Sequence, residues 1–273
     1  MASVSLRGVF CSDWVLIPQN EAPFYAELRS IVPPRLHARV IDDSVEKSTL
    51  SIRHKLTVMM YHAALINKLK PEEFVDFEEK DRYSAVPTQH AEVHHYGYSV
   101  KMNNIHEYRL YLALFLETFA ATAFSLLDVI AHLLRDLYQI PNLTSENTTF
   151  RKILPTMQPK VIYPFLIQYA PGNPTSVPWI KPLKEIRNRT THRPITDVCE
   201  AESRRRNSVF RAMPEAKGFF YLDPTIFGGI DVLLTDFVTQ VYDGLEEFVE
   251  DLYDHLRQAI IQAGTTKGSL PLD

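Results

Sequence analysis

The segment from Leu183 to His192 holds the residues whose types and spacing best suit chemistry. Within it Arg187 is followed directly by Asn188 and, after four intervening residues, by His192. Imidazole titrates near neutral pH and exchanges protons, whereas guanidinium stays charged and grips phosphate oxygens with paired hydrogen bonds. The pair therefore fits cleavage of a phosphodiester, in which one proton leaves a nucleophile, another reaches the leaving oxygen and negative charge is neutralised.

The same residues also fit structural roles. On an ideal helix Asn188 and His192 share a face, while Arg187 lies about 140° around from His192, so its side chain must swing or the helix must end between them. A histidine at a helix end can cap carbonyl groups, and Arg187 can pair with a carboxylate elsewhere in a bundle. An Arg-x4-6-His spacing arises by chance about twice in such a chain. The choice between a chemical and a structural role therefore depends on the elements around the motif.

Long helices are predicted on both sides of this segment. Residues 105–138 lack Pro and Gly and are apolar around most of the helix circumference, as expected for a helix buried among others. Residues 228–263 carry an apolar stripe with an acidic opposite face, and Gly264 closes the pattern. Residues 44–69 form the first clear helical pattern. With almost no strand signal, the chain is predicted to be an all-α bundle.

The motif itself falls on a shorter helix. Seven prolines between residues 155 and 182 allow only short helical turns, and a helix is then expected to start near Val177 or Pro178. Pro194 limits how far it extends. Residues 195–225 are expected to be a long polar excursion, and loops this long in a compact domain are usually functional or mobile.

This set of features resembles the HEPN superfamily, whose mark is R-x(4–6)-H, often R-N-x-x-x-H. Arg187, Asn188 and His192 match that mark residue for residue, and the resemblance covers roughly residues 101–263. It implies a HEPN-like helical bundle with long central and C-terminal helices at 101–263. The mixed N-terminal extension, 1–100, would contain one clear helix and a polar loop, and 264–273 would be a tail.

The resemblance also implies an activity. HEPN proteins are often metal-independent endoribonucleases that serve as toxins or antiviral defence effectors, act as homodimers and are controlled by an antitoxin or another regulatory protein. It implies RNA as the substrate and no cofactor or metal. Some family toxins carry a Tyr two residues after the His, where this chain has Pro194, so control through that Tyr is not expected.

The implied catalytic residues are Arg187 for the phosphate, His192 for proton transfer and Asn188 for orientation. A polar residue of an earlier helix often faces such a pair in the family. Asp128 and Glu117, about 20° apart on the helix at 105–138, are the candidates, with a structural carboxylate as the alternative for either. A non-catalytic helical module for dimerisation, or for RNA or protein binding, is the alternative for the whole protein.

The charge distribution adds candidate RNA contacts. The formal net charge is −4, which argues against a general nucleic-acid binder, yet residues 181–217 carry a net +5 and residues 231–257 a net −7. A basic island on an acidic body can focus an anionic ligand, although a solvated charged loop is the simpler alternative. The predicted RNA-binding residues are Arg189, Arg193, Arg204, Arg205, Arg206 and Arg211.

Other classes of protein are not indicated. The apolar stretch 108–137 contains six charged or histidine residues and the start lacks a signal pattern, so a cytoplasmic protein without a membrane span is expected. Cys11 and Cys199 are too few for a disulfide scaffold or a four-cysteine zinc site. A polar loop is favoured over a metal site at His90, His94 and His95. Phosphate-loop, dinucleotide and α/β-hydrolase motifs are absent from the sequence.

Overall fold

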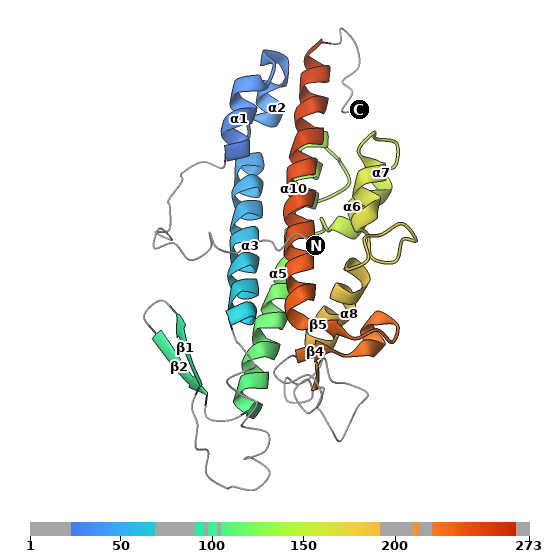
Figure 1. Ribbon diagram of the computed structural model, residues 1–273. Helices are drawn as coiled ribbons and strands as arrows, with labels where there is room; N and C mark the ends of the chain where they lie inside the picture. The colour runs from blue at the N-terminus through green and yellow to red at the C-terminus, as the bar shows by residue number, and fades with distance from the viewer. Residues whose placement is uncertain are drawn as a thin grey trace, which may run out of the picture. The chain divides into compact units, whose positions relative to one another are not determined.

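The structure is a computed structural model that describes residues 23–68, 91–95, 98–102, 105–191, 210–212 and 220–265 (Figure 1). Most of these residues are helical, which confirms the predicted all-α class. The elements in chain order are α1 (Pro23–Ile31), η2 (Pro34–Leu36), α2 (His37–Val40), α3 (Asp43–Lys68), β1 (Ala91–His95), β2 (Tyr98–Met102), α5 (Ile105–Tyr138), α6 (Phe150–Met157), α7 (Tyr163–Leu166), η4 (Ile167–Tyr169), α8 (Ile180–Thr191), β3 (Phe210–Ala212), β4 (Phe220–Leu222), η5 (Pro224–Phe227), β5 (Val232–Leu233) and α10 (Leu234–Thr265).

The chain divides into two compact units. Unit 1 consists of residues 1–59, 122–177 and 243–273, and unit 2 of residues 60–121 and 178–242. Each unit is assembled from segments far apart in the sequence, because α3, α5 and α10 each contribute to both. The units therefore do not coincide with the predicted linear division at residue 100.

The long helices follow their predicted patterns closely. The predicted helix at 105–138 is α5, and the one at 44–69 is α3, shifted by one residue at each end. Helix α5 ends where Gln139 adopts a φ of 50°, two residues before Pro141. The N–H of Ile140 donates to the carbonyl of Arg135 and that of Gln139 to the carbonyl of Asp136. This is a Schellman ending built without glycine.

The N-terminal region contains more helix than expected. The extension is predicted to contain one clear helix, yet α1, η2 and α2 also lie there, before α3. Pro23 is the first residue of α1 and Pro34 the first of η2. A proline costs little at a first helical position, because its missing N–H would have no partner inside the helix.

Two small sheets accompany the helices, where the sequence predicted a polar loop and an irregular excursion. Strands β1 and β2 form an antiparallel hairpin in which Val93 pairs with Val100, so the predicted boundary at residue 100 falls inside a strand. Strands β3, β4 and β5 form an antiparallel sheet in that order. Short strands of this kind were missed because periodicity over two to five residues is too brief to detect.

Helix α10 starts later than predicted. Its apolar stripe was read from residue 228, but Gly228 and Gly229 have φ angles of 68° and 97°. Gly228 ends η5 in the left-handed conformation, strand β5 follows, and α10 begins at Leu234. Ile230, counted in the predicted stripe, is 66% exposed. The C-terminal end lies at Thr265, so the first two residues of the predicted tail are helical.

Each unit buries its own set of apolar residues. In unit 1 Tyr169 stacks on Phe248 with ring centroids 3.8 Å apart, and burial raises the pKa of Tyr169 to about 12. In unit 2 Phe237 of α10 meets Phe227 of η5 edge to face. The buried residues of unit 2 include Ala63, Ile66, Leu112, Leu116, Phe119, Ile180, Leu183, Ile186, Leu234, Phe237 and Val241.

One stretch of the described chain has the composition of a membrane span. Residues Leu112–Tyr138 of α5 have a mean hydropathy of 1.7 in their most apolar window, and half of that window is buried. A helix in the core of a globular fold has the same length and composition. Length and hydropathy therefore fit both a membrane span and a core helix. The absence of a membrane partner stays a prediction.

Candidate functional site

Helix α8 carries the motif, and its sequence explains how it is held. Ile180, Leu183 and Ile186 recur at helical spacing and are fully buried. The carbonyl of Trp179 accepts the first helical bond, from the N–H of Leu183 at 2.9 Å. At the other end the hydroxyl of Thr190 donates to the carbonyls of Ile186 and Arg187, both at 3.1 Å. One face of α8 is thereby fixed, and the opposite face is presented outward.

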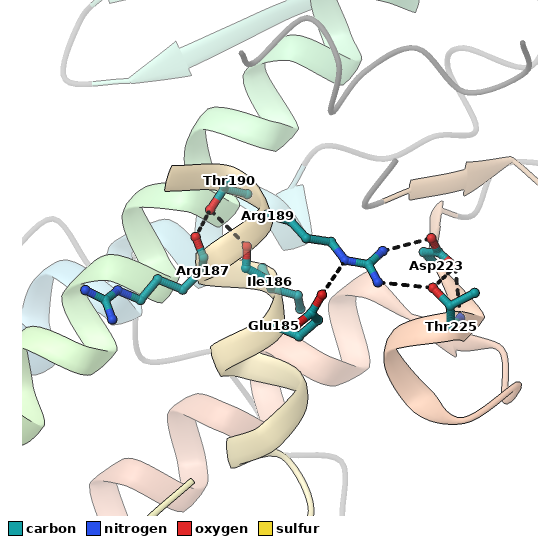
Figure 2. A network of polar contacts seen from close by, with 7 residues as sticks. All are labelled: Glu185, Ile186, Arg187, Arg189, Thr190, Asp223 and Thr225. Atoms are coloured by element: carbon teal, nitrogen blue, oxygen red, sulfur yellow. Dashed lines mark hydrogen bonds and ion pairs between the residues drawn. The ribbon is translucent and has the colours of Figure 1, made fainter. Parts of the chain in front are cut away.

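The two arginines of the motif segment point to opposite sides of α8 (Figure 2). They are two residues apart, which is about 200° around the helix. The Arg187 side chain is exposed, whereas Arg189 is largely buried, with 11% of its side chain accessible. Asn188, between them in sequence, is partly exposed. Of the two, Arg187 is therefore the one that a large ligand can reach.

Arg189 belongs to a network within unit 2 (Figure 2). Its Nε donates to Oε1 of Glu185 at 2.9 Å, one Nη to Oδ2 of Asp223 at 3.0 Å, and the other Nη to Oγ1 of Thr225 at 3.2 Å. Every nitrogen of the guanidinium thus donates to a protein oxygen. This geometry favours a structural role for Arg189, and its predicted RNA contact stays a prediction.

The partners of Arg189 were missed at the sequence level. Asp223 caps η5, since its Oδ1 accepts from the backbone N–H of Thr225 at 2.9 Å and from the Thr225 hydroxyl at 2.8 Å. Two signals were present: Glu185 stands four residues before Arg189, and Asp-Pro-Thr is a helix-start pattern. The long-range pairing of Asp223 with α8 had no local signal.

Several predicted site residues lie outside the described residues. These are His192, Arg193, Arg204, Arg205 and Arg206. Arg211 is placed only by its backbone, on β3 opposite Tyr221 of β4. Their predicted roles in proton transfer and RNA binding stay predictions.

The two candidate carboxylates of α5 differ in what the structure shows. Oδ1 of Asp128 accepts from the backbone N–H of Phe150 at 2.9 Å, at the first residue of α6 in unit 1. Asp128 therefore satisfies one of the N–H groups that a helix start leaves without a partner. Glu117 is partly buried on the part of α5 that belongs to unit 2. The structural alternative is thus favoured for Asp128, and the role of Glu117 stays open to experiment.

A second polar feature lies in unit 1. A surface pocket of about 350 Å³ is lined by Ala38, Asp42, Ser44, Arg135, Asp136, Gln139, Ile140, Pro141 and Leu143. Its charged groups are already engaged: Arg135 pairs with Asp136, and Asp42 accepts from the backbone N–H of Ser44 at the start of α3. Hydrogen bonds from the side chain and the backbone of Ser44 lower the pKa of Asp42. The charged groups of the pocket therefore already have partners within the protein.

Metal binding has no geometric support among the described residues, which contain no group of three or more His, Cys, Asp or Glu side chains suited to a metal. His94 and His95 are placed by their backbone on β1, and His90, Cys11 and Cys199 lie beyond the described ranges.

No protein-family model, no curated protein and no solved structure matches this chain. The site must therefore be judged from its own residues.

Proposed function

We propose that the protein is a metal-independent endoribonuclease of the HEPN type, with α8 as its catalytic helix. The observation that carries the proposal is the contrast between the two arginines of α8. Arg189 is largely buried, whereas Arg187, which matches the motif and directly precedes Asn188 in the sequence, has an exposed side chain. A phosphate-binding arginine has to reach solvent, and Arg187 does.

The proposed reaction proceeds through the RNA's own 2′-hydroxyl. His192 accepts the 2′ proton, the 2′-oxygen attacks the adjacent phosphorus, and the bond to the 5′-oxygen breaks as that oxygen receives a proton. Arg187 neutralises the charge that develops on the phosphate oxygens. The products are a 2′,3′-cyclic phosphate and a 5′-hydroxyl end.

A homodimer is part of the proposal. Each chain offers one motif histidine, whereas the reaction needs two proton transfers, and a two-fold axis would bring two copies of His192 to one cleft. Sedimentation at micromolar concentration should then give about twice 31.4 kDa. A monomer would contradict the shared cleft and leave only a site built within one chain.

The test is incubation of purified protein with mixed RNAs in EDTA, followed by analysis of the product ends. Wild type should cleave and leave cyclic ends. His192→Ala should lower the rate by about 10²–10⁴-fold, and Arg187→Ala by about 10²–10³-fold. Absence of cleavage by wild type, or equal cleavage by His192→Ala, would remove the proposal.

A non-catalytic helical module is the second candidate. The capping role of Asp128 favours it, because a carboxylate committed to the start of α6 serves the fold. In this case His192→Ala would lower the free energy of unfolding by several kcal/mol, as for a broken buried network. Catalytic residues instead leave stability unchanged or raised on removal.

A further inference from the structure

The outward face of α8 carries three cations. Among the α8 residues whose side chains the structure describes, 180–190, three are exposed: Lys181, Lys184 and Arg187. The remaining cation, Arg189, faces the other way and is neutralised by Glu185 and Asp223. Within the described chain neither Lys181 nor Lys184 has a salt bridge to a carboxylate. The two lysines therefore add positive charge to this face that no carboxylate of the described chain offsets through a salt bridge.

The start of α8 does not favour this pattern. Lys181 is the second residue of α8, where the positive end of the helix dipole disfavours a cation, and the first turn contains no acidic residue. Like charges three residues apart also repel one another. Helix α10, by contrast, has an acidic residue, Asp236, in its first turn, where the helix dipole favours a negative charge. A pattern that local energetics disfavour points to an anionic partner.

The length of the stripe indicates what kind of anion it fits. Arg187 lies six positions after Lys181, which is about 9 Å along a helix axis, more than a single phosphate group spans. Adjacent members are about 5–6 Å apart at their Cβ atoms. Asn188 lies within about 20° of Lys181 around the helix and adds a neutral hydrogen-bonding group to the same face. A chain of phosphates matches this arrangement.

We infer that the stripe formed by Lys181, Lys184 and Arg187 binds the phosphate backbone of single-stranded RNA and leads it to the Arg187 end of α8. The inference depends on the proposed function for the choice of RNA. Lys181 and Lys184 are then substrate-binding residues that hold nucleotides next to the scissile one. The exposed carboxylates of α10, such as Glu246, Glu247, Glu250, Asp251 and Asp254, repel RNA from that helix.

Binding can be measured apart from cleavage with a labelled 2′-O-methyl RNA, which lacks the attacking hydroxyl and stays intact. Fluorescence anisotropy over a range of salt concentrations gives the slope of log K against log salt. The double variant Lys181→Gln/Lys184→Gln should reduce the magnitude of this slope by about 1.4, since each backbone contact to a single strand contributes about 0.7. The control Lys47→Gln/Arg151→Gln removes two exposed cations from α3 and α6 and should leave the slope unchanged.

Each result decides the inference. Equal slopes for wild type and the lysine variant would overturn it, as would an equal loss in the control variant. Equally tight, equally salt-sensitive binding of polyglutamate would overturn the choice of RNA. If the stripe binds RNA but unmethylated RNA is not cut, the ribonuclease proposal fails and the binding surface stands. If wild type cleaves RNA but the wild-type and lysine-variant slopes are equal, the binding surface fails and the ribonuclease proposal stands.

Discussion

A guanidinium nitrogen of Arg189 lies 3.0 Å from Oδ2 of Asp223, a residue 34 positions further along the chain. Both side chains are largely buried, with 11% and 9% of their surfaces accessible. The pair ties α8 to the start of η5, and Glu185 and Thr225 complete the network. The turn of α8 that presents Arg187 is therefore held from its opposite side by a charge pair.

The first prediction contrasts the two arginines. Arg189→Ala should lower the free energy of unfolding by about 3–5 kcal/mol, because it leaves the buried Asp223 carboxylate without its cation. Arg187→Ala, two residues away and exposed, should change it by no more than about 0.5 kcal/mol. Urea denaturation of both variants measures the difference.

The double variant Arg189→Ala/Asp223→Ala provides the control for this pair. Removing both charges should cost less than the sum of the two single changes, since neither is then left buried alone. Additive losses, or similar losses for Arg187→Ala and Arg189→Ala, would contradict the network.

The second prediction concerns Asp128. Asp128→Ala should lower the free energy of unfolding by about 0.5–2 kcal/mol, because the N–H of Phe150 at the start of α6 loses its acceptor. Asp128→Asn keeps an oxygen there and should retain most of the stability. It should also retain any RNA cleavage. Loss of cleavage in Asp128→Asn at unchanged stability would assign Asp128 to catalysis instead.

The third prediction is a pH dependence in unit 1. Arg257 of α10 donates two hydrogen bonds to the carboxylate of Glu27 in α1, and these bonds lower the pKa of Glu27. A carboxylate with a lowered pKa in the folded state stabilises the fold above its unfolded value, about 4.3. That contribution disappears as the pH falls through the lowered folded pKa.

Thermal melts of Glu27→Gln across this range test the linkage. The variant should be less stable than wild type at neutral pH, and the two should converge in acid. Glu250→Gln removes an exposed carboxylate of α10 and serves as the control. A gap between wild type and Glu27→Gln that stays constant down to the most acidic pH would refute the role of Glu27.

The fourth prediction concerns the turn before α10. Gly228 has a φ of 68°, and a Cβ added there would meet no atom within 4 Å. Gly228→Ala therefore costs only the left-handed backbone conformation, about 1 kcal/mol. Gly228→Asn should cost less, because asparagine tolerates this region better. A loss of several kcal/mol in either variant, measured by denaturation, would mean that the position is crowded.

The local pattern of apolar and polar residues was sufficient to predict that the long helices exist. The absence of Pro and Gly from 105–138, with apolar residues around its circumference, predicted both ends of α5. The amphipathic stripe after residue 228 predicted α10 but not its first residue, because two glycines with positive φ and strand β5 intervene. Helix periodicity is a property of neighbouring residues, whereas a helix end depends on individual backbone angles.

The sequence by itself determined that Arg187, Asn188 and Arg189 lie on one helix, since Ile180, Leu183 and Ile186 recur at helical spacing. Only the tertiary structure decided which arginine faces solvent. Glu185 is a local partner of Arg189, but Asp223 comes from η5, and burial depends on which segment of the fold covers each side of α8. No spacing between neighbouring residues encodes that choice, because it is made by contacts between residues far apart in the chain.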